Sequence, residues 1–456
     1  MPTMNTGDTA WIIVASALVM FMTPGLALFY GGLVRQKNVL STFMHSFFAL
    51  GLVTVVFVLV GYSLGFGGDH AGFIGGFDFF GLKNVAFDAA GPKVCCAPGA
   101  APGLLSGATP HLAFMLFQLM FAVITPALIS GAFAERTKFS GMAVFFALWS
   151  LLVYSPVAHW VWAGGWLFDR GVLDFAGGTV VHINAGVAAL VFAVYLGKRQ
   201  GWPREIAPPH NVTMTLLGAG ILWFGWFGFN GGSALAANGI AVSAIVATHC
   251  AAAAAMLGWA IPEWLRHKKV TAVGAASGAV AGLVAITPAA GFVRPWAALV
   301  IGLVAGAVCY FAVNLKFRFG YDDSLDVVGV HLVGGIIGAL ATGVFAEIAV
   351  NAAGDNGALF GNLGQLADQA LGIAVTIGYS AVLSLGILWF VDKTVGIRLS
   401  QDDELVGADL TQHGEAAYSS GDVGAHIGHM AASVPWGHSG GFSASLSDTR
   451  QGRQGE

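Results

Sequence analysis

Long apolar segments, separated by short polar stretches, recur along most of the chain. A helix needs ~17–25 apolar residues to cross the ~30 Å hydrocarbon core of a bilayer. Segments of this kind occur eleven times, so the pattern predicts an all-α polytopic membrane protein with eleven transmembrane helices. The predicted spans are residues 11–33, 42–66, 111–134, 141–165, 178–197, 212–236, 240–265, 272–290, 296–315, 327–349 and 367–391.

The basic residues between these spans gather on one side of the predicted membrane. Of the 20 Lys and Arg residues, 16 follow the odd-numbered spans or lie in the tail, and 4 lie on the opposite side. Because loops rich in Lys and Arg stay in the cytoplasm, the N-terminus is predicted outside and the C-terminus inside. The four residues expected outside are Lys83, Lys93, Arg170 and Arg294.

Composition supports a membrane protein and excludes other classes. Apolar and aromatic residues make up 56% of the 456 residues and charged residues only 10%, against roughly 25% charged residues in soluble proteins. Nucleic-acid binding is excluded because 20 basic residues stand against 24 acidic ones. The neighbours Cys95 and Cys96 are unsuited to a strain-free bridge with each other, which leaves open a bond between protomers.

Two segments lie outside the predicted membrane domain, which covers residues 1–391. Residues 67–110 form a long outer loop rich in Gly, Pro and Ala. Residues 392–418 form a cytoplasmic tail. Residues 419–456 are rich in Gly, Ser and His, and we expect them to be disordered.

The two halves of the membrane domain repeat one another. Residues 174–186 (DFAGGTVVHINAG) parallel residues 323–335 (DSLDVVGVHLVGG), with Asp, Val, His and Gly at the same offsets, 149 residues apart. The halves cover residues 11–197 and 212–349, with five spans each, and a last helix follows at 367–391. Because an odd number of spans turns the second copy over, the sequence predicts an inverted repeat with its site near the midplane between the copies.

His182 and His331 are predicted to meet in the middle of the membrane. Each lies eight residues after an aspartate, Asp174 or Asp323, at the start of its span. Eight helical residues rise ~12 Å, and the two spans start from opposite faces of a ~30 Å core. An ionisable residue at this depth indicates function. The alternative is a purely structural hydrogen bond from each histidine to a neighbouring helix.

A pair of imidazoles suits a small polar solute. Neutral histidine offers one donor and one acceptor, and two adjacent rings cannot both be charged at low dielectric without a large cost. The pair therefore fits a neutral hydrogen-bonding solute or a proton relay, whereas a bare cation would meet a large desolvation penalty. Zinc is disfavoured because no third ligand is clearly placed at this depth. The only other candidate ligand at this depth, His249, is expected to be a core residue.

Several motifs resemble those of the ammonium transporter family (Amt/Mep/Rh), and most closely those of its bacterial Amt branch. The resemblance extends over residues 11–418. It depends on five separated stretches, namely Asp174 to Gly186 continuing to Arg199, Trp226 to Ser233, Phe29 to Gly32, Ala134 to Arg136, and Gly329 to His331.

The resemblance implies a substrate path with an outer vestibule, a gate and a pore. The vestibule would recruit ammonium by cation–π attraction and hydrogen bonding, and the gate would exclude water and hydrated ions. The implied residues are Trp162 and Ser233 in the vestibule, Phe121 and Phe229 in the gate, His182 and His331 in the pore, Trp226 packed against the histidines, and Asp174 as a buried, mainly structural carboxylate.

The resemblance also implies the substrate, the partners and the location. Ammonium, with methylammonium as a further candidate, would lose its proton near the gate and cross as NH3. Whether the proton follows through the histidines stays open. The protein would be a homotrimer in the cytoplasmic membrane, and residues 392–418 would help to form a docking face for a PII-type signalling protein. No cofactor, metal or enzymatic activity is implied.

Two alternatives remain at this point. The first is an ammonium sensor that signals through the tail. The second is an intramembrane metalloenzyme with a metal held between His182 and His331.

Overall fold

A computed structural model gives the fold of the protein. The described residues up to Glu415 form one compact unit, and all helices and strands named below belong to it. Cys95, Cys96 and the predicted disordered tail after Tyr418 lie outside the described residues. The structure describes residues 4–85, 109–205 and 207–418.

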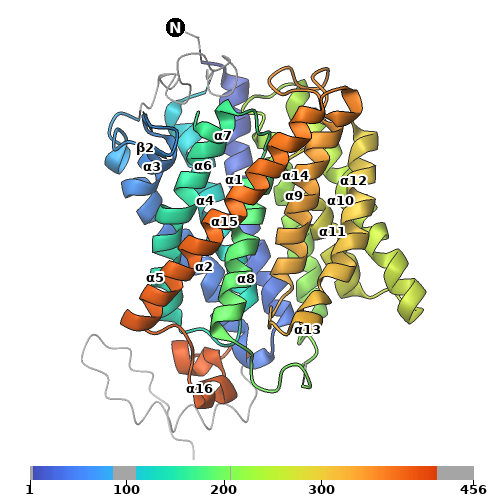
Figure 1. The fold of residues 1–456 in the computed structure, drawn as a ribbon. Helices are drawn as coiled ribbons and strands as arrows, with labels where there is room; N and C mark the ends of the chain where they lie inside the picture. Colours follow the sequence, from blue (N-terminus) through green and yellow to red (C-terminus); the bar gives the residue numbers. More distant parts are fainter. Residues whose placement is uncertain (1–3, 86–108, 206, 419–456) are drawn as a thin grey trace, which may run out of the picture. The chain divides into compact units, whose positions relative to one another are not determined.

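The first half of the helical unit contains α1 to α8 (Figure 1). Its helices are α1 (Thr6–Leu33), α2 (Val39–Val56), α3 (Tyr62–Phe66), α4 (His111–Phe133), α5 (Phe139–Trp149), α6 (Ser155–Trp162), α7 (Trp166–Asp169) and α8 (Asn184–Leu196). Short helical turns at Gln36–Asn38, Phe57–Gly61, Phe80–Leu82, Ser150–Tyr154 and Gly178–Ile183 complete it. In the predicted outer loop, β1 (Asp69–His70) pairs antiparallel with β2 (Ile74–Gly75).

The second half contains α9 to α14, followed by the last long helix and the start of the tail. Its helices are α9 (Val212–Gly232), α10 (Gly239–His267), α11 (Ala272–Ile286), α12 (Pro295–Ala312), α13 (Leu315–Phe319), α14 (Val333–Phe345), α15 (Leu363–Thr394) and α16 (Gln401–Val406). Helical turns occur at Val328–Leu332, Ala358–Phe360 and Asp409–His413.

Ten helical segments in the described part of the chain are long and apolar enough to cross a membrane, and they coincide with ten of the eleven predicted spans. The exception is the predicted span 272–290, which is helical only over the 15 residues of α11, or about 22 Å. The helix ends two residues before Pro288, which has no N–H to continue the helical hydrogen bonds. Eleven crossings and an outer N-terminus stay predictions.

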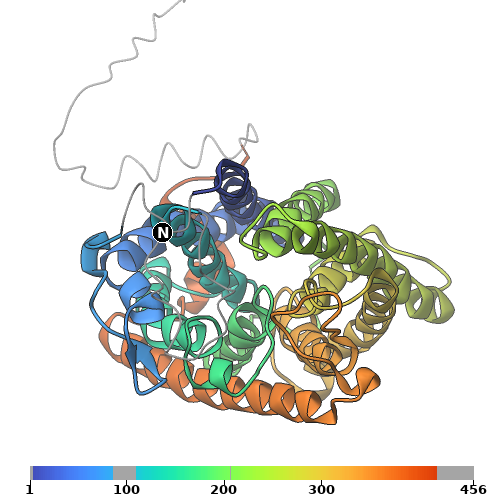
Figure 2. The ribbon, with the colours of Figure 1, turned by 90° about the horizontal axis from the view of Figure 1, so that it is seen from above.

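The two halves lie side by side, and α15 runs along both of them (Figure 2). The helix α1 packs along α9, and α10 packs against α11 and α12. The last helix, α15, contacts α5 and α8 of the first half and α14 of the second. The space enclosed between the halves is therefore bounded by helices of both repeats.

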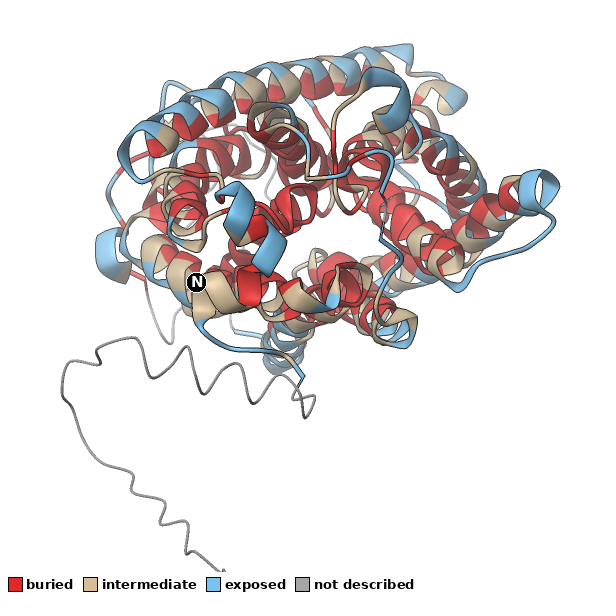
Figure 3. Ribbon diagram, turned by 90° about the horizontal axis from the view of Figure 1, so that it is seen from below, coloured by how far each residue is buried: buried red, intermediate tan, exposed pale blue. Residues whose placement is uncertain are grey.

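Small residues allow the helices of the second half to pack closely. A Cβ atom added to Gly302 or Gly306 on α12 would collide with the backbone oxygen of Ala251 or Ala255 on α10. Outward-facing parts of the peripheral helices are exposed, and the interior is buried (Figure 3). Because these exposed faces carry large apolar side chains, they suit a hydrocarbon environment. Such side chains on α10, α12 and α15 include Val242, Leu257, Leu303, Val308, Val382 and Leu385.

Candidate functional site

His182 and His331 meet inside the helical unit, as the repeat predicts. Their Nδ1 atoms are 3.3 Å apart, and their ring centroids are 5.3 Å apart at an interplanar angle of 27°. Since one Nδ1 must donate the hydrogen and the other accept it, the two neutral rings hold opposite tautomers. Each histidine lies on a π-helical turn, Gly178–Ile183 or Val328–Leu332.

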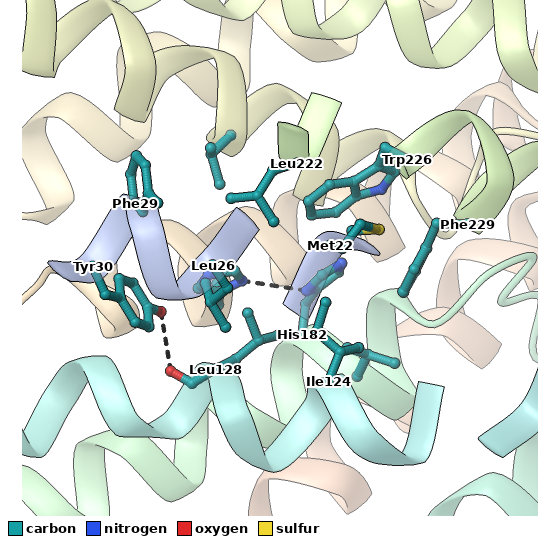
Figure 4. A pocket seen from close by; sticks show the side chains of 13 residues that line it. Met22, Leu26, Phe29, Tyr30, Ile124, Leu128, His182, Leu222, Trp226 and Phe229 are labelled. Carbon is teal, nitrogen blue, oxygen red and sulfur yellow. Dashed lines mark hydrogen bonds between the residues drawn. The ribbon is translucent and has the colours of Figure 1, made fainter. Parts of the chain in front are cut away.

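The pair lines a narrow cavity (Figure 4). The cavity offers about 10 Å³ to the centre of a water-sized molecule. This is room for about one water. Nε2 of His182 is buried and has no hydrogen-bond partner among the described residues, so it is available to a small solute. The cavity is lined by Met22, Leu26, Phe29, Tyr30, Ile124, Leu128, Val181, His182, Leu222, Trp226, Phe229, Val280 and His331.

Trp226 on α9 holds the His182 ring from one side. The two rings are stacked with centroids 5.5 Å apart and an interplanar angle of 21°. The indole Nε1 of Trp226 donates to Oγ1 of Thr287 at 2.9 Å, which fixes the indole plane. Sequence reasoning identified Trp226 but missed Thr287, which lies in the turn after α11.

Two phenylalanine rings separate this cavity from a second pocket. Phe121 and Phe229 are stacked with centroids 4.2 Å apart. Trp162 lies edge-on to Phe121, with centroids 5.8 Å apart and an interplanar angle of 90°. Both phenylalanines are 1% exposed. The structure therefore brings the predicted gate and vestibule residues together.

The second pocket combines aromatic faces with a few polar groups. Its room for the centre of a water-sized molecule is about 30 Å³. Ser233 donates its hydroxyl hydrogen to the backbone oxygen of Phe229 at 2.8 Å, which leaves the Oγ lone pairs as acceptors. Gln118, which sequence reasoning missed, has a buried Oε1 without a partner in the described part of the chain. The lining residues are Phe114, Phe117, Gln118, Phe121, Trp162, Phe175, Ser233 and Leu235.

Asp174 caps the start of the helical segment that carries His182. Its carboxylate accepts four backbone N–H groups at 2.6–3.1 Å. Its own backbone oxygen accepts a hydrogen bond from Nε1 of Trp162 at 2.9 Å. Asp174 therefore satisfies free N–H groups at the helix start and links this start to Trp162 in the second pocket. The four donors are the N–H groups of Gly177, Gly178, Thr179 and Val180.

A network of charged residues joins four loops on the side of the unit opposite the second pocket. Sequence reasoning missed this network. Glu135 binds Arg35 and Arg199, each at 3.0 Å. Asp322 binds Arg199 at 2.8 Å and fully buried Arg136 at 3.7 Å. The backbone of Glu135 has a left-handed φ of 75°, which the sequence does not reveal.

These ion pairs outweigh the cost of burying the carboxylates. Burial alone would raise the pKa of Glu135, but Arg199 and Arg35 hold it below its usual value. Burial likewise opposes ionisation of Asp322, and the guanidinium groups of Arg199 and Arg136 lower its pKa. Both side chains are therefore charged in the folded protein.

The beginning of the tail packs on the same side. Asp409 accepts the backbone N–H groups of Leu40 and Ser41 at 3.1 and 2.8 Å, at the start of α2. Glu404 accepts the N–H of Gln200 at 2.7 Å. These contacts attach the tail to the loops on either side of the charged network.

Among the residues that the structure describes, no three His, Cys, Asp or Glu side chains lie close enough together to hold a metal.

The expectation that His249 is a core residue is wrong. His249 is exposed on α10, and its ring lies against Trp223, with centroids 5.3 Å apart. The periodicity of a helix that is apolar on all sides does not identify its buried face.

Residues 10–418 match the model of the Ammonium Transporter Family. The chain is a member of the ammonium transporter family. It is 50% identical over 416 residues to the ammonium transporter of Bacillus subtilis (strain 168), which covers 91% of this chain and 99% of that protein. The solved structure of Candida albicans Mep2 matches with a TM-score of 0.82 at 38% identity, over 91% of each chain.

A solved structure described as a sensor Amt protein also matches, with a TM-score of 0.79 at 29% identity over 89% of this chain and 98% of that chain. As a member of the ammonium transporter family with ten membrane-length helices, the chain is an integral multi-pass membrane protein. Its curated relatives are named as transporters and not as enzymes.

The charged network should make this transporter sensitive to acid. We expect Glu135→Gln to lower stability by about 3 kcal/mol near neutral pH, because Arg35 and Arg199 lose their buried partner. The folded-state pKa of Glu135 is depressed, so its stabilisation is present above the unfolded-state pKa of ~4.3 and is lost as pH falls through the folded-state pKa. Thermal unfolding of the purified protein at several pH values measures the effect.

The matched control is Glu415→Gln, which removes an exposed carboxylate. The thermal unfolding midpoint of Glu415→Gln should equal that of the wild type at every pH. If Glu135→Gln unfolds at the wild-type temperature near neutral pH, the network does not have the stabilising role assigned to it.

Proposed function

We propose that this transporter conducts ammonia through the cavity between its two halves, after binding NH4+ at the outer pocket. The main support is the buried pair of His182 and His331 in an otherwise apolar cavity. NH3 is neutral and close to water in size, and it both donates and accepts hydrogen bonds. A cavity of about 10 Å³ with an unpartnered Nε2 on His182 suits such a solute.

The outer pocket is suited to recruiting the cation. The indole face of Trp162 and the ring of Phe121 offer cation–π attraction. The Oγ of Ser233 and the unpartnered Oε1 of Gln118 can accept N–H groups. The carboxylate of Asp174, below Trp162, adds negative potential and holds the helix start in place.

The stacked rings of Phe121 and Phe229 determine which species continues. An ammonium ion that passed between them would lose its hydration without a charged partner, at a large cost in free energy. Ammonium can avoid this cost by giving its proton to water on the outer side and crossing as NH3. Potassium has no proton to lose, so the same barrier excludes it.

Inside the cavity, the two histidines replace the hydrogen bonds that NH3 makes with water outside. The opposite tautomers of the pair provide a donor and an acceptor along the cavity. The proton has two routes, either back to the outer solution or inward through the pair. The first route gives an electroneutral channel and the second an electrogenic carrier.

Further features of the proposal concern partners and location. We propose that the protein is a homotrimer in the cytoplasmic membrane, with its N-terminus outside. The tail contacts at Glu404 and Asp409 support a docking face for a PII-type signalling protein on the inner side.

A sensor role is the second candidate, because one structural neighbour is described as a sensor Amt protein. A sensor would bind ammonium at the outer pocket and change the contacts of the tail without bulk transport. Flux through purified protein distinguishes the two functions.

The test of transport uses ammonium pulses on proteoliposomes, with current and internal pH measured together. We expect the wild type to respond to ammonium and His182→Ala to respond about tenfold less, the equivalent of one lost hydrogen bond. Current without the pH rise expected of NH3 entry would support the electrogenic route. A pH rise without current would support the electroneutral one.

The matched control is His267→Ala, which removes an exposed histidine at the end of α10 and should leave both responses unchanged. The absence of any ammonium-dependent response in the wild type would contradict the proposed transport and leave the sensor role.

Trp162 should determine the affinity for the cation. We expect Trp162→Leu to raise the half-saturating ammonium concentration roughly twofold to thirtyfold, because it removes a cation–π contact worth ~0.5–2 kcal/mol. The same flux assay, run over a series of ammonium concentrations, measures this change. The control Trp296→Leu alters an exposed indole on α12. Equal half-saturation in Trp162→Leu and wild type would remove Trp162 from the binding site.

A further inference from the structure

The two aspartates that begin the histidine-bearing segments differ in how their carboxylates are satisfied. In the first half, Asp174 accepts four backbone N–H groups, two on each oxygen. In the second half, Oδ2 of Asp323 accepts the N–H of Val328 at 2.7 Å, and the N–H of Val327 also lies near this carboxyl and favours its charged form. Its Oδ1 is buried and has no hydrogen-bond partner among the described residues. A buried carboxylate oxygen without a donor is costly unless it binds a proton or a solute.

Asp323 has neighbours that line the histidine cavity and neighbours that line a larger inner pocket. Tyr30 lines the histidine cavity and is close enough to Asp323 for their charges to interact. Lys316 lines the inner pocket, and its Nζ donates to the backbone oxygen of Asp323 at 3.0 Å. The next residue, Ser324, also lines the inner pocket.

The inner pocket is larger and more polar than the histidine cavity. Its room for the centre of a water-sized molecule is about 100 Å³, enough for several waters. Through these neighbours, Asp323 is linked both to a nearly dry cavity and to a space that can hold water. The pocket is lined by Leu33, Arg35, Glu135, Arg199, Gln200, Trp202, Glu205, Ala207, Lys316, Phe317 and Ser324.

Burial and neighbouring charges make Asp323 titrate near neutral pH. Burial, opposed by Lys316 and reinforced by Asp326, raises the pKa of its carboxyl to about 6. The other titratable groups that interact with it electrostatically are Arg136, Tyr30 and Tyr321.

We propose that Asp323 is the proton-exchange group at the inner end of the ammonia path, through its free Oδ1. This inference depends on the proposed function. The protonated carboxyl gives its proton to NH3 that leaves the histidine cavity. The O–H bond breaks, an N–H bond forms, and NH4+ enters the inner pocket. The carboxylate then regains a proton from water in that pocket, and the hydroxide so formed is neutralised by bulk buffer.

This reaction explains why the repeat is not symmetric in its hydrogen bonds. The oxygens of Asp174 are each occupied by two N–H donors, which stabilises the charged form. Asp323 retains an oxygen that can cycle between the two protonation states. The inner aspartate is therefore the reactive member of the pair, and the outer one is a positioning residue.

Infrared spectroscopy of the full chain in lipid membranes tests the proposal directly. We expect the wild type to show a carboxyl band that titrates with a midpoint near pH 6 and that changes when ammonium is added. Asp323→Asn should lose this band but retain an oxygen for the N–H of Val328. Ammonium flux should fall about tenfold or more in this variant, the scale of a lost acid–base group.

The control is Asp355→Asn, which removes an exposed carboxylate between α14 and α15 and should retain both the ammonium-sensitive band and the flux. Wild-type flux in Asp323→Asn, or survival of the titrating band, would overturn the proposal. If Asp323→Asn fails to fold, the carboxyl infrared band of the wild type still tests the proposal. A band that ammonium does not alter also overturns the inference. A wild type without ammonium flux would instead overturn the proposed function.

Discussion

Polar groups inside an apolar helical unit must find their partners within the protein, and this constraint explains the central features of the fold. The two imidazoles bind each other, and Trp226 binds Thr287. The side chain of Asn230 donates to Thr248 at 2.8 Å. Several buried side-chain atoms still have no partner among the described residues. Three of them lie along the proposed path, namely Nε2 of His182, Oε1 of Gln118 and Oδ1 of Asp323.

The internal repeat supplies the two halves of the site, and local departures from it give each half its own chemistry. Both histidines lie on π-helical turns, in which the wider backbone ring changes the direction of the side chain relative to a regular α-helix. On the outer side, aromatic rings cover the path. At the other end, paired charges join four loops and the tail, so the same architecture offers aromatic faces at one end and a larger polar pocket at the other.

Much of this arrangement can be read from the chain, and the rest depends on contacts remote in sequence. Ten spans follow from hydropathy alone, and the eight-residue spacing from aspartate to histidine places the imidazoles together. The π-helical turns and the left-handed Glu135 require the tertiary structure, because no local pattern encodes them. His249 shows a related limit, since a helix apolar on all sides gives no clue to which face is outermost.

The position of α15 has a consequence for how the protein can move. This helix crosses both halves and packs on α5, α8 and α14, so a large swing of one half about the other would have to shear those contacts. The hydrogen bond between the histidines spans the same boundary and would break as well. Small ring rotations at Phe121 and Phe229 therefore fit the proposed movement of NH3 better than a cycle in which the protein opens alternately to each side. Such a conduit can turn over quickly without accumulating its substrate against a gradient, unless the proton also crosses.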